Sequence, residues 1–301
     1  MTTINRRRFL ETSMGLGLAA VTAQPAYSAE RMDNTKSGYQ IGCFTRPWDK
    51  YDYRAALDAI AEAGFEYAGL MTCSNTKNRL VVSVQTTPEE AQAIGEEVRK
   101  RNLKVPAVYG GNIPVTESLE AGIEGLKKLI DNCVAVGSAS LLMGGTSSPE
   151  LNDLYYKAIA ECCDYAESKK LMITVKPHGG LNATGPQCRK LIEQVGHRNF
   201  TLMYDPGNIF YYSDGELNPV EDAKTVHGVV YGMCVKDYQH PKKVDVTPGT
   251  GQVNFRAVLA ELQKGGFTQG PLVIETLAPG EKDAMIEEAR KAREFLEKLI
   301  A

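Results

Sequence analysis

From Tyr39 onward, the chain alternates short apolar runs with longer amphipathic runs, and no other feature constrains the fold as strongly. The short runs are rich in Val, Ile, Leu, Met and Tyr. They mostly lack strict apolar–polar alternation, as expected of parallel strands that are buried on both faces. They predict strands at residues 39–44, 67–71, 105–109, 140–143, 172–176, 201–205, 230–236 and 272–275.

The longer runs have the apolar spacing of helices that are buried along one face. They predict helices at residues 53–63, 88–102, 117–136, 150–169, 185–195, 219–227, 255–264 and 282–299. Several ends carry recognisable signals. Thr87 precedes Pro88, which favours the first position of a helix, and Gly64 follows the first helical run and favours its end.

Eight strand–helix units in about 260 residues match a single (β/α)8 barrel, which we predict for residues 39–301. An open doubly wound sheet is the competing fold, but it would need a glycine-rich phosphate turn after its first strand. The residues at that position are Thr45-Arg46-Pro47-Trp48, which do not form such a turn. No linker or change in composition divides the body, so we expect one catalytic domain with its chemistry at the carboxyl ends of the strands.

Residues 1–28 have the three parts of a secretory signal. A basic start at Arg6-Arg7-Arg8 precedes an apolar run at residues 14–23, and Ala26-Tyr27-Ser28 offers a cleavage site. The Arg pair before Phe-Leu resembles a twin-arginine signal, which predicts passage through the twin-arginine export machinery and a periplasmic or otherwise exported protein. The apolar run is too short for a stable membrane anchor. An ordinary N-terminal amphipathic helix is the alternative.

Charge and cysteine content narrow the function classes further. The chain has 34 Lys and Arg against 37 Asp and Glu, for a net charge of −3, which argues against a nucleic-acid-binding protein. Its seven cysteines have no zinc-type spacing and mostly lie in apolar runs, where Cys acts as a small apolar residue. So many free thiols suit folding in the cytoplasm before export better than folding in an oxidising periplasm.

Charged or polar residues end four consecutive predicted strands. Strand five ends at Lys176 and is followed by His178, strand six ends in Asp205-Pro206-Gly207-Asn208, strand seven in Cys234-Val235-Lys236-Asp237, and strand eight at Glu275. Charges at the end of a buried strand are costly unless they are paired or bound to a metal. In a barrel all four ends lie on the face that carries the chemistry. A simple turn at 205–208 and a local Lys236–Asp237 ion pair are the structural alternatives.

These strand ends resemble the xylose-isomerase-like TIM barrels of the sugar phosphate isomerase/epimerase family. The resemblance covers residue 39 to the C-terminus and is strongest at residues 205–208, 235–237, 248–251 and 274–276. Family members usually bind one divalent metal. Its ligands are a Glu from strand five, an Asp from strand six, a His or Gln from strand seven and a Glu from strand eight. Asp205 and Glu275 match this pattern directly. Lys176 and Cys234 stand where Glu and His are usual, and His178 matches a His often found in this loop.

The resemblance implies one divalent metal ion (manganese, zinc or magnesium) on Asp205 and Glu275, with His178 and Cys234 as further candidate ligands. Lys176 cannot be a ligand while it is protonated, because an ammonium has no lone pair. Cys234 could bind only as a thiolate, which favours zinc. In the alternative arrangement, Lys176 replaces the metal as a fixed positive charge that pairs with both carboxylates.

The implied activity is a sugar isomerase or epimerase reaction that abstracts a proton next to a carbonyl, with metal assistance. Glu275 is the candidate base, with Lys176 and Lys236 as further catalytic groups. The expected partner is a small carbohydrate, and we assign its binding to Arg46, Trp48, Tyr109, Asn208 and Asp237. A lyase or hydrolase of an oxidised sugar and a non-catalytic periplasmic carbohydrate-binding protein are the alternatives. The pattern is compatible with an oligomer and does not identify the sugar.

Overall fold

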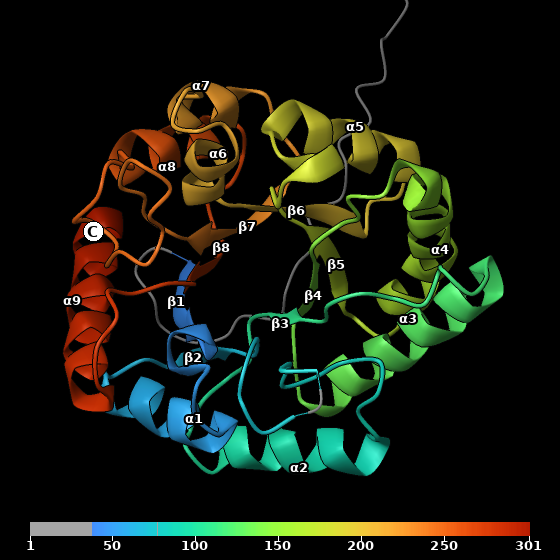
Figure 1. The fold of residues 1–301 in the computed structure, drawn as a ribbon, viewed down its shortest axis with the longest axis horizontal. Coiled ribbons are helices and arrows are strands. Elements are labelled where there is room, and N and C mark those ends of the chain that lie inside the picture. Colours follow the sequence, from blue (N-terminus) through green and yellow to red (C-terminus); the bar gives the residue numbers. More distant parts are fainter. Residues whose placement is uncertain (1–37, 77) are drawn as a thin grey trace, which may run out of the picture. The chain divides into compact units, whose positions relative to one another are not determined.

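The computed structural model describes residues 38–76 and 78–301, so the predicted signal segment at residues 1–28 lies outside the described part. Eight parallel strands alternate with helices that surround them (Figure 1). The strands are β1 (Tyr39–Phe44), β2 (Tyr67–Gly69), β3 (Val108–Tyr109), β4 (Ser140–Met143), β5 (Met172–Val175), β6 (Phe200–Tyr204), β7 (Val230–Val235) and β8 (Gly270–Ile274).

The main helices are α1 (Tyr53–Glu62), α2 (Pro88–Arg99), α3 (Leu119–Ala135), α4 (Pro149–Ser168), α5 (Gly185–Val195), α6 (Pro206–Tyr212), α7 (Pro219–Lys224), α8 (Phe255–Lys264) and α9 (Lys282–Ile300). Local chemistry fixes several of their ends. Thr87 and Glu90 form a capping box at the start of α2, and Thr184 and Gln187 form another at α5. Each box satisfies backbone N–H groups that a helix start leaves without partners.

The strands form one sheet in the order β2-β1-β8-β7-β6-β5-β4-β3. Isolated parallel bridges from Tyr67 to Lys104 and from Leu70 to Val108 join the two outer strands. The sheet therefore closes almost completely, and the prediction of a (β/α)8 barrel is confirmed. Within the described residues, no helix is both long and apolar enough to cross a membrane.

Several predicted ends shift by a few residues, and two larger differences concern the third strand and the segment after β6. The strand predicted at 105–109 is reduced to Val108–Tyr109 with an isolated bridge at Val105, because Pro106 between them has no N–H to donate to a neighbouring strand. Residues 206–212 form the short helix α6, which we did not predict. Asp205 begins it, since its side chain accepts a hydrogen bond from Asn208 N, and Pro206 occupies the first turn.

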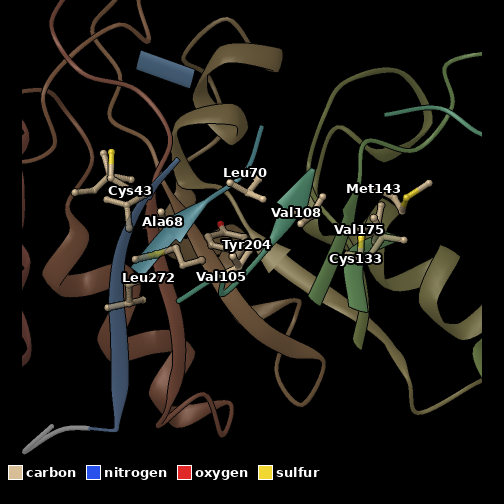
Figure 2. Close-up of a cluster of buried hydrophobic side chains, with 14 of the residues drawn as sticks. Cys43, Ala68, Leu70, Val105, Val108, Cys133, Met143, Val175, Tyr204 and Leu272 are labelled. Carbon is tan, nitrogen blue, oxygen red and sulfur yellow. The ribbon is translucent and has the colours of Figure 1, made fainter. Parts of the chain in front are cut away.

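Two apolar clusters alternate along the strands. The larger one fills the space between strands and helices, and Figure 2 shows members of it from different sides of the barrel, among them Cys43, Val108, Tyr204 and Leu272. The smaller cluster fills the barrel interior. Its members are Phe44, Met71, Ala107, Leu142, Met203, Cys234 and Val273.

Candidate active site

Strand alternation directs the four predicted charged residues toward the barrel axis. Met203, Cys234 and Val273 belong to the interior cluster, whereas the residues that follow each of them face the helices. Side chains alternate sides along a strand. The next inward positions are therefore Asp205, Lys236 and Glu275, and Lys176 ends β5 in the same way. The structure brings these four side chains together at one end of the barrel, which is the arrangement that the sequence predicted.

Two lysines bridge the two carboxylates, and all four side chains are buried. Lys176 Nζ lies 2.5 Å from Glu275 Oε2 and 3.3 Å from Asp205 Oδ2. Lys236 Nζ lies 2.7 Å from Glu275 Oε1 and 3.2 Å from Asp205 Oδ2. We call these four residues together with Arg46 the charge cluster.

Arg46 links the charge cluster to the outside. Its Nη1 donates to Glu275 Oε1 at 2.5 Å, and its side chain is 35% exposed, in contrast to the buried lysines. Three cations and two carboxylates leave the cluster with one excess positive charge. Asp245 also lies near Arg46, but it is exposed, so solvent screens its charge.

The close pairing fixes the charge states of the cluster. Burial opposes ionisation of Glu275, but Lys176, Lys236 and Arg46 hold the pKa of its carboxyl well below the usual range. Burial also disfavours the charged form of Lys176, yet Glu275 and Asp205 raise the pKa of its ammonium above the ordinary value. At neutral pH Lys176 is an ammonium without a lone pair, and Glu275 is a carboxylate whose lowered pKa makes it a weak base.

The donor atoms present do not fit a divalent metal. Ligand atoms of Asp205, Cys234 and Glu275 lie within 4.8 Å of one another, as a metal site requires. However, ammonium or guanidinium groups already contact Asp205 Oδ2 and both oxygens of Glu275, and Asn208 N donates to Asp205 Oδ1. A second positive ion there would be repelled by both lysines.

Two of the predicted ligands are also unsuitable. Cys234 Sγ lies among apolar residues of the barrel interior, and burial raises the pKa of its thiol well above the ordinary value. A metal ligand must be a thiolate, so Cys234 acts here as an apolar filler. The imidazole of His178 does not join Asp205 and Glu275 in a group with ligand atoms within 4.8 Å among the described residues.

His178 instead lies at the entrance to the charge cluster. Its side chain is exposed, and its ring lies 6.1 Å from the Tyr109 ring and 6.3 Å from the Tyr212 ring, between centroids. Desolvation by the surrounding walls, together with the charge of Lys176, lowers the pKa of His178 to about 4. The imidazole is therefore neutral at neutral pH and can accept a proton.

Asn208 and Asp237 are buried, and their side chains bind other groups of the protein. Asn208 accepts from Lys236 Nζ at 3.0 Å and donates to the Pro177 carbonyl at 2.6 Å. The Asp237 carboxylate accepts backbone N–H groups of residues 238, 249, 251 and 253, at 2.8–3.0 Å. The interpretation of Asp237 as a substrate-binding residue is wrong, because its lone pairs already organise the loop at residues 246–253.

The prediction that Trp48 binds the substrate is also wrong. Its side chain is fully buried in the large apolar cluster, so it has no exposed face on which a sugar ring could stack. Arg46 and Tyr109 do reach the opening of the site, as does Tyr212, which sequence reasoning missed. Tyr212 is the last residue of the unpredicted helix α6. The Asp-Pro pair at 205–206 was the available signal for that helix.

A cavity of about 630 Å3 opens beside the charge cluster at the carboxyl ends of β3 to β5. Tyr109 and His178 line it, together with residues of the loops that follow those strands. The structure therefore offers a neutral imidazole and a partly exposed guanidinium, above buried lysine–carboxylate pairs, beside a space for a ligand.

Comparison with known proteins agrees with this architecture. The family model described as xylose isomerase-like TIM barrel matches residues 57–299. No curated protein matches the chain. A xylose isomerase domain protein from Planctomyces limnophilus is 21% identical, with a TM-score of 0.65 over 87% of this chain and 97% of that chain.

Two further solved structures are similar. The D-allulose 3-epimerase from Methylomonas sp. is 17% identical, with a TM-score of 0.66 over 87% of this chain and 98% of that chain. A xylose isomerase-like TIM barrel protein from Mycobacterium smegmatis, solved in complex with magnesium, is 14% identical, with a TM-score of 0.68 over 87% and 96% of the two chains. At these identities the likeness shows the shared fold.

Proposed function

The chain belongs to the xylose isomerase-like TIM barrel family, and from this premise we propose that it is a sugar isomerase that moves a proton next to a carbonyl without a divalent metal. The observation that carries the proposal is the charge cluster, in which Lys176 and Lys236 bridge Asp205 and Glu275. Sugar epimerases with the same fold support the reaction class. The lysines supply fixed positive charge at the strand ends where the family's metal was expected.

Arg46 is the group that contacts the carbonyl oxygen of the sugar. One of its nitrogens binds Glu275, and no other hydrogen bond of its guanidinium is found among the described residues, so donors remain for a ligand. The two ammoniums and two carboxylates beneath it balance one another, so the excess positive charge of the cluster lies at Arg46. As a proton leaves the neighbouring carbon, negative charge develops on that oxygen, and this prearranged positive field stabilises it.

His178 takes the proton. This role replaces the sequence prediction, in which Glu275 was the base. The neutral imidazole accepts the proton from the carbon next to the carbonyl, and the electron pair of the broken C–H bond forms the double bond of an enediolate. The proton of the neighbouring hydroxyl passes to the former carbonyl oxygen. The imidazolium then returns its proton to the former carbonyl carbon, and the new carbonyl forms at the carbon that lost its proton. One base on one face of the sugar suffices for this isomerisation, whereas an epimerase needs a donor on each face.

Replacing His178 by Gln should lower the rate of proton transfer about 10²-fold or more, the usual loss on removing a general base. We expect kcat/KM of the wild type to be flat at neutral pH and to fall as the pH drops through about 4, because His178 then becomes protonated. The measurement is deuterium uptake at the reacting carbon of aldoses and ketoses in D2O, followed by NMR across this pH range.

His197→Gln is the matched control, since His197 pairs with Asp164 at the opposite end of the barrel, after α5. It should retain both the rate and the pH profile. An unchanged rate in a folded His178→Gln protein would exclude His178 as the base. If neither the wild type nor either variant exchanges deuterium into any carbonyl sugar, the alternative of a carbohydrate-binding protein is favoured.

We also propose that the protein is exported. The support is the sequence signal at residues 1–28, which carries Arg7-Arg8 before Phe9-Leu10 and a small-residue cleavage site at Ala26-Tyr27-Ser28. An exported isomerase would meet sugars outside the cytoplasm.

A further inference from the structure

The cavity beside the charge cluster is larger than the reaction requires. Its volume of about 630 Å3 equals that of about 20 water molecules in the liquid. A hexose has twelve non-hydrogen atoms, and its reacting end must lie at Arg46 and His178. Of the residues that line the cavity, His178 and Tyr109 lie near the charges of the cluster, and Asn182 contacts it through the Lys176 carbonyl. Most of the space therefore lies to one side of the reacting atoms, beyond His178.

The walls of this lateral pocket combine two kinds of surface. Asn112, Thr116 and Ser147 have exposed side chains for which no hydrogen bond is found within the described chain, so their polar atoms are available to a ligand. Val84, Val115 and Leu151 contribute apolar surface to the same space. A sugar ring has hydroxyls around its edge and C–H groups on its faces, and it needs both kinds of wall.

The pocket is a built feature of the fold. Gly145 has φ +79°, and a Cβ there would lie 2.6 Å from Asn182 Oδ1. A Cβ on Gly144 would lie 2.7 Å from the Tyr109 hydroxyl and 3.1 Å from His178 Nδ1. The Asn182 amide donates to the carbonyls of Gly144 and Lys176, at 2.9 and 2.7 Å. These contacts connect the pocket wall to the strand end that carries Lys176.

A buried hydroxyl points to a polar ligand. Tyr155 lines the pocket with 2% of its surface exposed. Its hydroxyl makes no hydrogen bond of ordinary geometry, and the Gly145 amide is the polar backbone group near it. Buried hydroxyls are nearly always hydrogen-bonded in native proteins, and a ligand hydroxyl in the pocket would complete this one.

We propose that the lateral pocket binds a second sugar unit, so that the substrate is a disaccharide whose carbonyl-bearing sugar lies at Arg46 and His178. The class of reaction rests on the proposed function, whereas the assignment of the pocket as a sugar-binding site depends only on the geometry of the pocket. Asn112, Thr116, Ser147 and Tyr155 bind the hydroxyls of the second sugar, and the apolar wall packs against its ring face. The pocket therefore sets the preference for a disaccharide over a single sugar.

Filling the pocket tests this assignment. Thr116→Trp places an indole at the exposed rim, away from the charge cluster, and Ser147→Trp does so from a second loop. With reducing disaccharides of glucose, deuterium uptake in wild type should proceed with a kcat/KM at least tenfold above that with glucose or fructose. Each variant should lose this preference through a KM about tenfold higher for the disaccharide. Thr268→Trp, before β8 at the opposite end of the barrel, is the matched control.

Binding of unreactive probes keeps the test independent of turnover. We would measure methyl glucoside and the methyl glycosides of α-1,4- and β-1,4-linked glucose disaccharides by saturation-transfer NMR and calorimetry. Preferential binding of a disaccharide that Thr116→Trp abolishes and Thr268→Trp retains supports the pocket, even if no sugar exchanges deuterium and the proposed reaction fails. Equal binding of the single sugar and the disaccharides, no binding of any of them, or equal loss in both Trp variants would overturn the proposal.

Discussion

Lys176→Met should reduce deuterium uptake about 10²-fold while the protein stays folded, because it removes the excess charge that stabilises the enediolate. In the wild type, three cations face the two carboxylates Asp205 and Glu275. Without Lys176 the charge cluster is neutral, and the developing negative charge next to Arg46 loses its net attraction. The Met side chain keeps the length of the lysine stem and leaves no large cavity.

The cost in stability should be modest. Glu275 Oε2 loses its ammonium partner, whereas Oε1 keeps Lys236 and Arg46, and Asp205 keeps Lys236. Removing one partner of a buried ion pair costs about 3–5 kcal/mol when the remaining charge is left unpaired. The cost is smaller here because two cations still contact Glu275, and it stays below the usual free energy of unfolding. Urea denaturation followed by circular dichroism measures this loss separately from the rate.

The double variant Lys176→Met with Glu275→Gln distinguishes the effect of the cluster's net charge from the loss of a general base. It removes one cation and one anion, so the excess charge of the cluster is the same as in the wild type. If His178 is the base, the double variant should recover a measurable part of the rate that Lys176→Met lost. If Glu275 is the base, as the sequence suggested, the double variant should be slower than Lys176→Met. A folded Lys176→Met protein with full activity would remove Lys176 from the site altogether.

The second large effect is a gain of metal binding. Lys176→Glu combined with Cys234→His supplies the Glu, Asp, His and Glu donors that the family resemblance assigns to strands five to eight. The Lys176 ammonium is then absent, and Lys236 still bridges Asp205 and Glu275. A third carboxylate offsets the charge of Lys236, and an imidazole takes up a position beside the carboxylates. We expect zinc or manganese to bind with a Kd of roughly micromolar or tighter, as for a site with several converging protein ligands.

Calorimetry and metal analysis of the dialysed proteins measure this gain. The matched control, Lys176→Met with Cys234→His, lacks the new carboxylate and should bind at least tenfold more weakly, about 1.4 kcal/mol less in binding free energy. Wild type should bind neither metal at this site. Tight stoichiometric binding by the wild type would show that Lys176 and Lys236 do not keep a metal out.

The barrel could be predicted from the sequence because its signals are local. Strands buried on both faces read as apolar runs, and each helix has an amphipathic pattern and, in several cases, a cap such as Thr87. The strand ends at Lys176, Asp205, Lys236 and Glu275 followed from the same pattern. The short helix α6 was missed because Asp205-Pro206-Gly207-Asn208 has the composition of a turn.

Residue roles depend on contacts that sequence position does not determine. Asp237 has the residue type of a ligand-binding group, but backbone amides from a loop twelve to sixteen residues away occupy its carboxylate. Trp48 follows a strand end, yet its indole packs into the core. His178 could be read as a metal ligand from its loop position. Because its imidazole lies outside the group formed by Asp205, Cys234 and Glu275 and its pKa is lowered to about 4, we propose that it accepts a proton instead.

Chelation tests the central claim most directly. Wild-type protein dialysed against EDTA and then against metal-free buffer should take up deuterium into its sugar substrate at the original rate. Added manganese, magnesium or zinc should change that rate by less than about twofold, because fixed lysine charges and not a metal stabilise the developing anion. Loss of uptake on chelation, with recovery on adding back one of these ions, would contradict the account.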